Sequence, residues 1–339
     1  MKYDVNLDLA NATKKQMYEH LNTGNPRVLN KPSFFASLYS LDLSGYDSPV
    51  LVMKTEEPGS KQLLAMEHGR IEGVCFDMIN HLINDCIVSG ARPLLVQDAI
   101  ICGKLDQEIV SKIVKAISMA CVAQDCLLTG GETSEQPGVL PVGTYILCSS
   151  VVGVVEKAAI IDGTRISNGD SVICLPSNGA HTNGYTFIRK LMKEYPGIKE
   201  QKIGDETFLD AILMPHKCYY RSLRQFFGGE AVMGLAHITG GGIRENLDRI
   251  LPSTLDAEID LSKYVIPELF KVMHAATLAG DDEMLRTFNL GVGMVAIVKR
   301  QEKDSVLDGL RCEGVNAYEI GQIVNGSGKV VCKNSLMWN

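Results

Sequence analysis

The chain has 339 residues, of which 45% are hydrophobic and 22% charged, and its formal net charge is −7. This length exceeds what one hydrophobic core usually serves, so we expect two domains. The acidic balance argues against a surface that binds nucleic acid or an anionic membrane. It also means that a phosphate ligand would need divalent cations such as Mg²⁺ to offset repulsion from the protein.

The ten cysteines indicate a reducing compartment. They include no C-x-x-C pair and no Cys/His cluster at zinc spacing, and most lie in apolar runs, where a thiol behaves as a small hydrophobe. The N-terminus is polar and acidic without a targeting signature, and no apolar run approaches the length of about eighteen residues that a membrane span needs. The sequence therefore predicts a cytoplasmic protein.

Hydrophobic periodicity in the first half predicts alternating strands and helices. In chain order these are a strand at Val50–Lys54, a helix at Cys75–Gly90, a strand at Leu94–Ile101, a helix at Gln107–Ala123, and strands at Cys126–Thr129 and Tyr145–Val155. The polar segment Glu156–Gly169 carries Asp-Gly and Asn-Gly turn signals and is the best domain boundary. We expect one domain over residues 1–157 and a second over residues 158–339.

The second half alternates in the same way. Its predicted elements are a strand at Ser171–Leu175, a helix at Tyr185–Tyr195, a strand at Ala231–Ile238, a helix at Arg244–Ile250, a strand at Gly293–Val298, a helix at Asp304–Cys312 and a final strand pair. The expected fold class is therefore α/β plus α+β.

One face of the first predicted helix is polar and favours a functional role. Asp77, Asn80, His81, Asn84 and Asp85 fall on one arc because residues four apart lie one turn above another. All are short, poor helix formers, which a merely solvated face would not select. Their carboxylate and amide oxygens suit a hard cation. The histidine by itself is more typical of packing or hydrogen bonding.

Two loops of the first half combine glycines with charge. Gly130–Gly138 follows an apolar run with paired glycines and two carboxylates, a composition that suits a metal-bridged polyphosphate, although an ordinary turn has the same pattern. Thr55–Lys61 ends in Gly-Ser-Lys but lacks the glycine spacing of a P-loop. It fits either a metal and phosphate site or a surface turn.

Three segments of the second half favour a ligand. Ser177–Tyr185 carries hydrogen-bonding side chains, including His181, before a predicted helix, and a helix N-terminus suits an anion. His237–Gly242 ends in three glycines, which imply close backbone approach to a ligand or to another strand. Arg286–Met294 places Arg and Asn before a Gly-x-Gly strand entry, which is weak evidence for a nucleotide.

Taken together and in this order, the segments resemble the phosphoribosylformylglycinamidine cyclo-ligase (AIR synthetase) family, from about Val50 to the C-terminus. The matching motifs are Asn84-Asp85, Asp98 with Gly103–Asp106, Gly130–Thr133, His181 with Asn183–Tyr185, Ala236–Gly242, and Arg286–Asn289 with Gly291–Met294. The resemblance implies an N-terminal α/β domain whose strands complete a barrel with a second subunit, a C-terminal α+β sandwich, and therefore a homodimer. It also implies an enzyme that uses ATP and Mg²⁺ to convert formylglycinamidine ribonucleotide into aminoimidazole ribonucleotide, ADP and phosphate.

The resemblance also assigns roles. The residues that would bind ATP are Glu56, Gly59, Ser60, Lys61, Asn84, Gly130, Gly131 and Thr133. The residues that would bind metal are Asp77, Asp85, Asp98 and Glu132, with Glu56 also near the ions. The residues that would bind the ribonucleotide are Asn183, Gly184, Thr239, Gly240, Gly241, Gly242, Arg286 and Asn289. Either His181 or His237 would move the proton that is lost when the ring closes.

One departure from the family keeps an alternative open. The family motif Asp-Gly-Val-Gly-Thr-Lys is represented here by Glu56–Lys61, in which Glu57 and Pro58 add charge and stiffness. A related ATP-dependent enzyme with a different amide or carboxyl-type substrate is therefore a second reading. Selenophosphate synthetases use a cysteine or selenocysteine near the N-terminus, but no cysteine precedes Cys75 here. The hydrogenase-maturation dehydratase uses a C-terminal cysteine, but this sequence ends in Leu-Met-Trp-Asn. A non-catalytic binding protein with this fold is a third reading.

Overall fold

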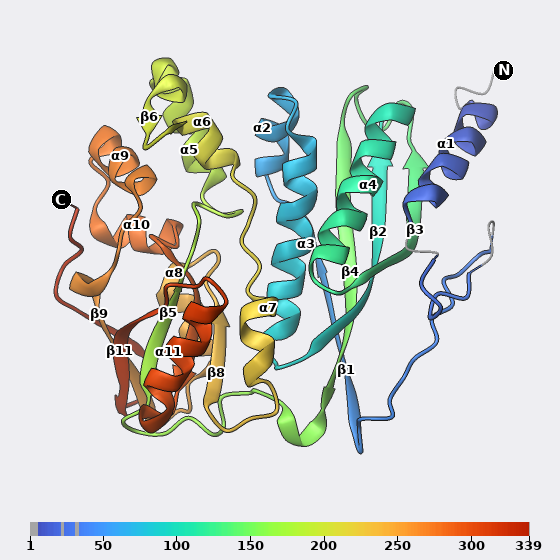
Figure 1. Ribbon diagram of the computed structural model, residues 1–339. Coiled ribbons are helices and arrows are strands. Elements are labelled where there is room, and N and C mark those ends of the chain that lie inside the picture. Colours follow the sequence, from blue (N-terminus) through green and yellow to red (C-terminus); the bar gives the residue numbers. More distant parts are fainter. Residues whose placement is uncertain (1–5, 22–23, 31–33, 339) are drawn as a thin grey trace.

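The computed structural model describes residues 6–21, 24–30 and 34–338. Two β-sheets stand side by side (Figure 1), one built from residues 49–156 and the other from residues 171–333. This mixed architecture confirms the predicted fold class. The domain limits at residues 157 and 158 stay a prediction, although the two sheets fall on either side of them. Among the described residues no helix combines the length and apolarity needed to cross a membrane.

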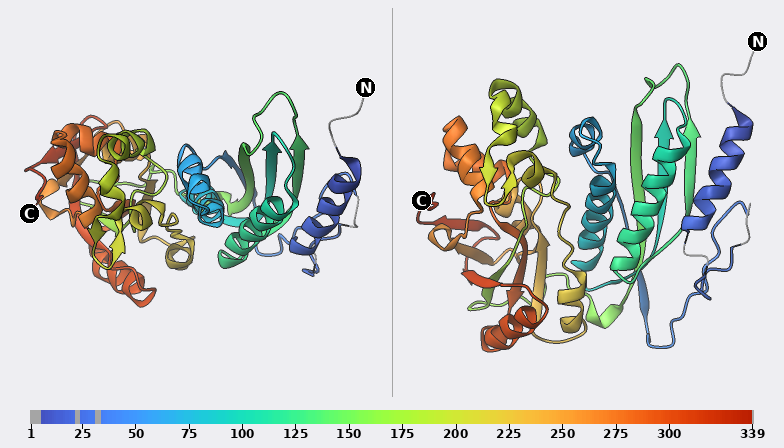
Figure 2. Two further views of the ribbon diagram at one scale, coloured as in Figure 1. Left: turned by 90° about the horizontal axis from the view of Figure 1, so that it is seen from above. Right: turned by 45° about the horizontal axis from the view of Figure 1, so that its top comes forward.

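The N-terminal sheet has four strands in the order β1-β4-β2-β3, of which only β2 and β3 run parallel. Its elements are α1 (Leu7–His20), β1 (Pro49–Glu56), α2 (Lys61–Glu67), α3 (Ile71–Ile87), β2 (Arg92–Cys102), α4 (Gln107–Ala123), β3 (Leu127–Glu135) and β4 (Tyr145–Glu156). Helices α3 and α4 cover one face, and α1 packs on α4 (Figure 2). The opposite face of the sheet carries no helix among the described residues of this chain.

Strand alternation decides which residues meet the helices. In β1 the even-numbered positions Val50 and Val52 turn towards the helix layer, whereas Leu51 and Met53 are exposed on the open face. In β2 the buried positions Val96, Asp98 and Ile100 share the helix face. The sheet is open in one chain, so the barrel with a second subunit stays a prediction.

The C-terminal sheet has six strands in the order β12-β9-β11-β5-β10-β8. Its strands are β5 (Ser171–Pro176), β8 (Val232–His237), β9 (Leu255–Asp260), β10 (Val292–Val298), β11 (Tyr318–Asn325) and β12 (Val330–Lys333), and a separate hairpin joins β6 (Lys202–Ile203) to β7 (Glu206–Thr207). The helices are α5 (Tyr185–Glu194), α6 (Phe208–Leu213), α7 (Tyr220–Leu223), α8 (Gly242–Leu247), α9 (Glu268–Thr277), α10 (Asp281–Thr287) and α11 (Lys303–Cys312). Strand β10 is buried along its whole length, as its uninterrupted apolar sequence predicts.

Two sequence predictions need correction. The segment Gly130–Glu135 is not a loop, because β3 continues through it in parallel register with β2. A side chain at Gly131 would meet the carboxylate of Asp98, so the glycine allows two strands to approach. The final two strands do not pair with each other: β11 lies between β5 and β9, and β12 pairs with β9.

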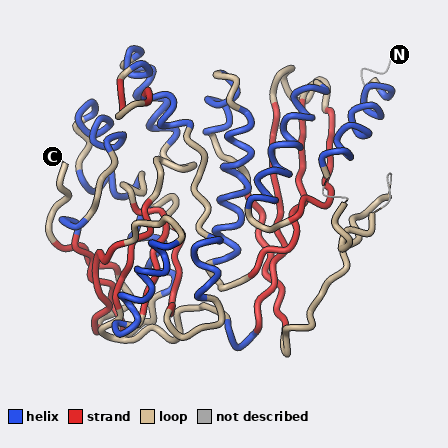
Figure 3. Tube along the Cα trace, viewed as in Figure 1, coloured by secondary structure: helices blue, strands red, loops and turns tan. Residues whose placement is uncertain are grey.

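The polar face of α3 docks the second domain. Helix α3 lies between the two sheets (Figure 3), and its side chains bind the backbone of the segment that connects α6 to α7. Asn80 donates to the carbonyl of His216, and Asn84 donates to the carbonyl of Lys217 while accepting from the amide of Tyr219. The short polar residues of this face are therefore selected largely by the domain junction.

Candidate functional site

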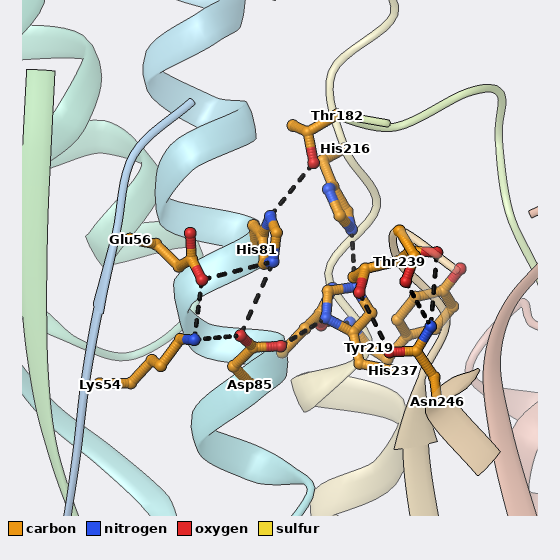
Figure 4. A network of polar contacts seen from close by, with 12 residues as sticks. Lys54, Glu56, His81, Asp85, Thr182, His216, Tyr219, His237, Thr239 and Asn246 are labelled. Carbon is orange, nitrogen blue, oxygen red and sulfur yellow. Dashed lines mark hydrogen bonds and ion pairs between the residues drawn. The ribbon is translucent and has the colours of Figure 1, made fainter. Parts of the chain in front are cut away.

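A network of charged side chains occupies the junction where β1, α3 and β8 meet (Figure 4). The ammonium of Lys54 lies 2.8 Å from Oε1 of Glu56 and 3.2 Å from Oδ2 of Asp85. The hydrogen bond to Glu56 raises the pKa of Lys54. Burial alone would raise the pKa of Asp85, but its hydrogen bond with His237 and the nearby positive charges hold that pKa below its usual range. Asp85 is therefore an anion that the domain junction stabilises.

His237 is oriented by this anion. Its Nδ1 lies 2.7 Å from Oδ1 of Asp85, so Nδ1 carries the proton and Nε2 carries the lone pair. Nε2 of His216 lies 3.0 Å from that lone pair, and the ring of His81 stands edge-on to His237 at 5.0 Å. A carboxylate that fixes one ring nitrogen leaves the other as a base or a metal ligand.

His181 has a different setting. It is buried, and its backbone φ is +57°, a conformation that is uncommon for residues other than glycine. Its Nε2 lies 3.1 Å from Oδ1 of Asn178, and its ring stacks on that of His216. Burial lowers the pKa of His181 well below its ordinary value, so the ring is neutral at neutral pH.

Oxygen atoms from three neighbouring strands form a row on the helix face of the N-terminal sheet. Glu56 pairs with Ser149, and Ser149 pairs with Asp98. The hydroxyl of Ser149 and Oδ2 of Asp98 are buried and have no hydrogen-bond partner among the described residues. Burial raises the pKa of Asp98 to about 7. Unpaired buried oxygens beside carboxylates fit a hard cation, which would supply the missing partner.

Glu132 does not join this row. It pairs with Ala99, the residue after Asp98, so it points to the opposite face of the sheet and is exposed. Within this chain Glu132 and Asp98 therefore do not lie together, and the metal role expected for Glu132 stays a prediction.

The other predicted residues of β3 also lie away from the junction, since β3 is the strand farthest from β1. The glycine at 130 faces Ser37, and Gly131 faces Asp98. The hydroxyl of Thr133 lies near the sulfur of Met17 on α1. The chain does not bring Gly130, Gly131 and Thr133 together with the charged network.

Lys61 and Asp77 are held by buried contacts within the protein, and the roles in phosphate and metal binding expected for them stay predictions. The ammonium of Lys61 is fully buried and donates to Oδ1 of Asp77 and to the carbonyls of His181 and Met214. These three contacts use all three donors of the ammonium. The same carboxylate oxygen accepts from the amide of His216. Burial raises the pKa of Asp77 and lowers that of Lys61, because each ion has lost its hydration.

Two asparagines are likewise occupied within the protein. Asn84, expected near ATP, instead joins the domains through the backbone of Lys217 and Tyr219. Asn289, expected near the ribonucleotide, donates to the carbonyl of Gly179 and accepts from Ser177 and Gly291. Both amides hold backbone in place. Arg286, in contrast, is exposed and lies 3.3 Å from Glu245.

The triple glycine turn is required by packing. Gly241 and Gly242 have φ values of +89° and +65°, and a side chain on Gly242 would lie 1.8 Å from the carbonyl oxygen of Leu285. Gly240 has room for a side chain, because a Cβ there would make an ordinary van der Waals contact, 3.5 Å from the amide oxygen of Asn183. Thr239 donates to Asn246, whose amide in turn donates to the carbonyls of the turn.

A cleft of about 770 Å³ opens beside this turn. It lies between α5, the start of α2, and the connection from α9 to α10. Its walls include Ser60, Asn183, Gly184, Lys190 and Thr287. Nδ2 of Asn183 is buried without a partner among the described residues, so it can donate to a ligand. Helix α5 starts at this cleft, which makes its first amide groups available to an anion. Among the predicted positions, this cleft gathers Ser60, Asn183 and Gly184, with Gly59 next to Thr182 on its rim.

Sequence reasoning did not single out Lys54 and His216, and it placed His81 on the polar arc but read the histidine by itself as a packing or hydrogen-bonding residue. His81 lies within hydrogen-bonding distance of the Thr182 hydroxyl and 3.7 Å from a carboxylate oxygen of Asp85. The polar arc on α3 was the available signal for His81. His216 lies in the segment Pro215–Tyr219, which has no local motif.

Comparison with known proteins agrees with this architecture. The family described as AIR synthase related protein matches with its N-terminal domain over residues 43–155 and with its C-terminal domain over residues 167–333. Phosphoribosylformylglycinamidine cyclo-ligase of Chromobacterium violaceum is 40% identical over 302 residues, which cover 89% of this chain and 87% of the relative. The protein of the same name from Carboxydothermus hydrogenoformans is 36% identical over 331 residues, which cover 97% of this chain and 95% of the relative.

Solved structures share the fold at low identity. The hydrogenase maturation protein HypE in complex with ATP superposes with a TM-score of 0.69 at 18% identity, covering 93% of this chain and 88% of that one. Thiamine-monophosphate kinase from Stenotrophomonas maltophilia gives a TM-score of 0.67 at 14% identity, with 97% and 96% covered. The two cyclo-ligases are 40% and 36% identical to this chain, whereas the two solved structures are 18% and 14% identical. On that evidence the chain belongs to the phosphoribosylformylglycinamidine cyclo-ligase family.

Proposed function

We infer that the chain is an ATP-dependent cyclo-ligase that converts formylglycinamidine ribonucleotide into aminoimidazole ribonucleotide, ADP and phosphate, a step of purine biosynthesis. The observation that carries this conclusion is its identity of about 40%, over nearly nine-tenths of the chain, to proteins named for that reaction. The enzyme is accordingly a ligase that forms a C–N bond.

The chemistry explains the need for ATP. A formamide carbonyl is a poor electrophile, and its oxygen is a poor leaving group. Transfer of the γ-phosphoryl group to that oxygen releases ADP and gives an imidate whose phosphate leaves when the amidine nitrogen attacks the carbon. Closure of the ring releases one proton. The protein mainly has to orient two substrates, offset negative charge and accept that proton.

We assign the proton transfer to His237 in preference to His181. The contact with Asp85 fixes the proton of His237 on Nδ1 and stabilises the imidazolium that forms when Nε2 accepts a second proton. His181 is fully enclosed, and no carboxylate faces its ring within hydrogen-bonding distance among the described residues. A charged form of His181 would therefore be costly.

The ribonucleotide fits the cleft at the start of α5. The amide of Asn183 and the first backbone amides of α5 can donate to a phosphate group. The ammonium of Lys190 also lies in the wall, 3.9 Å from the carboxylate of Glu194. These features recognise an anionic, hydroxyl-bearing ligand. Thr239 and Gly240 border the same region through Asn183, whereas the structural contacts of Asn289 leave it to support the loop.

For Mg²⁺ we propose the oxygen row at Glu56 and Asp98, with Ser149 between them and Asp85 nearby. The support is that two of these buried oxygens have no partner among the described residues and that all are hard ligands. When bound, Mg²⁺ offsets the charge of the triphosphate. Glu56 and Asp98 would hold the ion, and Lys54 neutralises the carboxylates in its absence.

A homodimer and a cytoplasmic location also remain proposals. The open face of the N-terminal sheet exposes Leu51, Met53 and Ile146, and a second copy of this face would cover those side chains. All ten cysteines are free thiols, which suits a reducing compartment.

The decisive assay supplies ATP, Mg²⁺ and formylglycinamidine ribonucleotide and follows ADP together with the aminoimidazole product. We expect one ADP for each ring closed, and no ADP when the ribonucleotide is omitted. Release of ADP that does not depend on the ribonucleotide would favour a related enzyme with another substrate. A lack of turnover with correctly folded protein would contradict the assignment.

A further inference from the structure

Four of the seven histidines of the chain gather at the domain junction. They come from separate elements: α3, the loop after β5, the connection from α6 to α7, and the end of β8. These are His81, His181, His216 and His237. The rings of His181 and His216 are stacked with centroids 3.8 Å apart, and those of His216 and His237 lie 5.0 Å apart. Figure 4 shows His81, His216 and His237 close together, with His216 and His237 joined through their ring nitrogens.

Hydrogen bonds determine where the protons of two of these rings lie. The contact with Asp85 places the proton of His237 on Nδ1 and leaves a lone pair on Nε2. Asn178 donates its amide hydrogen to the carbonyl of Pro215, so its oxygen must accept from Nε2 of His181. The lone pair of His181 is therefore on Nδ1. That atom is buried and has no partner among the described residues.

The third ring follows from His237. When His237 is neutral, His216 approaches its Nε2 at 3.0 Å by donating its own Nε2 proton to that lone pair. Its Nδ1 then carries a lone pair, and this atom too is buried without a partner among the described residues. Two unpaired buried acceptors in stacked rings are unfavourable unless something else occupies the site.

We propose that His181, His216 and His237 bind one transition-metal ion of the Zn²⁺ class. One nitrogen from each ring lies within 4.8 Å of the other two. Asp85 and Asn178 hold the opposite N–H of His237 and His181, which is the usual arrangement behind histidine ligands. Imidazole nitrogen selects Zn²⁺, Co²⁺ or Ni²⁺ over Mg²⁺, so this site differs from the oxygen row. The ion would replace the hydrogen bond between Nε2 of His216 and Nε2 of His237. Because the rings of His181 and His216 are stacked, one of these two would also turn about its Cβ–Cγ bond to share the ion.

His81 stands outside the set. Its Nδ1 is already paired with the hydroxyl of Thr182, and its Nε2 faces the carboxylates of Glu56 and Asp85. The alternative trio of His81, Asp85 and His237 would break the short contact that orients His237. His81 therefore provides a matched control, being a neighbouring imidazole of the same cluster.

The proposed metal site does not rest on the proposed function, but the expected inhibition of ring closure by the metal does. An ion on Nε2 of His237 removes the lone pair that we assign to proton transfer, so Zn²⁺ should inhibit ring closure. Metal binding without inhibition would count against His237 as the base and leave the site intact. Inhibition by Zn²⁺ in a chain that gives no four-coordinate Co²⁺ spectrum would place the ion elsewhere and overturn the site.

The test uses the full chain, freed of metal with a chelator and titrated with Co²⁺. We expect one equivalent to give the intense visible absorption of a four-coordinate ion, which Zn²⁺ then abolishes. His216→Gln should lose this absorption, His81→Gln should retain it, and Asn178→Ala should weaken binding by about 10- to 100-fold. The weak spectrum of octahedral Co²⁺ with the unaltered chain, or full binding by a folded His216→Gln variant, would overturn the proposal. The spectrum of the unaltered chain remains decisive if His216→Gln fails to fold.

Discussion

Lys61 and Asp77 form a buried ion pair that joins the two domains. The ammonium lies 2.8 Å from the carboxylate, and the side chains are 1% and 0% exposed. The lysine also holds the carbonyls of His181 and Met214, which belong to the second domain. The pair therefore connects the start of α2 and the middle of α3 to the loops that carry the histidines.

Replacement of Lys61 by Met should lower the free energy of unfolding and leave the affinity for ATP nearly unchanged. It leaves the carboxylate of Asp77 buried without its partner, a change that typically costs about 3–5 kcal/mol. Urea unfolding of Lys61→Met measures the loss. Arg70→Ala is the control, because it removes an exposed pair with Asp210 and should cost at most about 1 kcal/mol. If Lys61→Met proved as stable as the unaltered chain but bound ATP poorly, the lysine would contact phosphate after all.

Asp85→Asn should reduce turnover while leaving the fold intact. The variant can no longer fix the proton on Nδ1 of His237 or stabilise the imidazolium, so kcat should fall by roughly 10²- to 10⁴-fold. Steady-state kinetics and circular dichroism measure the two effects. Glu313→Gln removes an exposed carboxylate at the end of α11, outside the charged network and the open sheet face, and is the matched control. Unimpaired activity of Asp85→Asn would remove the Asp85–His237 pair from the reaction.

Asn183→Ala should weaken binding of the ribonucleotide and leave binding of ATP unchanged. The lost donor would face a phosphate, and hydrogen bonds to charged groups contribute about 1.5–3 kcal/mol, so KM for the ribonucleotide should rise roughly 10- to 100-fold. Initial rates with each substrate varied in turn separate the two constants. Equal effects on both constants, or a change in the constant for ATP alone, would place the ribonucleotide outside this cleft.

The triple glycine turn offers a matched pair of variants. Gly242→Ala forces a side chain into the left-handed region and against the carbonyl oxygen of Leu285, so we expect a loss of about 2–5 kcal/mol of stability. Gly240→Ala meets only an ordinary contact and should change stability by less than about 1 kcal/mol. Thermal unfolding compares them. Similar losses for both would mean that the turn is not held by α10.

Local signals predict much of the fold. Helix α4 begins and ends at the expected residues, because Asp106 caps its first turn and the apolar stripe runs its full length. Helix α1 is not predicted, since its sequence has little apolar periodicity and it is stabilised by packing on α4. Strand β3 extends beyond its predicted end, because its glycines have the composition of a loop but allow close pairing with β2.

The site is less accessible to sequence reasoning. The polar arc of α3 is recognisable, but its role in docking depends on the backbone of His216 and Lys217, more than 130 positions along the chain. The contact between Asp85 and His237 spans 152 positions and follows from how the two domains pack. No spacing of residues along the chain could have shown that the histidines meet.

A charge on the open sheet face should dissociate the proposed dimer. Met53 is 72% exposed in the single chain, and Leu51 lies on the same face two residues earlier. If a second copy covers this face, Met53→Lys buries an ammonium in an apolar interface, which is strongly unfavourable. Light scattering coupled to size exclusion should then report monomers. Leu278→Lys alters a side chain on the other domain that is 83% exposed and should leave the mass unchanged. A monomeric unaltered chain, or a Met53→Lys variant that remains dimeric, would show that this face does not form the interface.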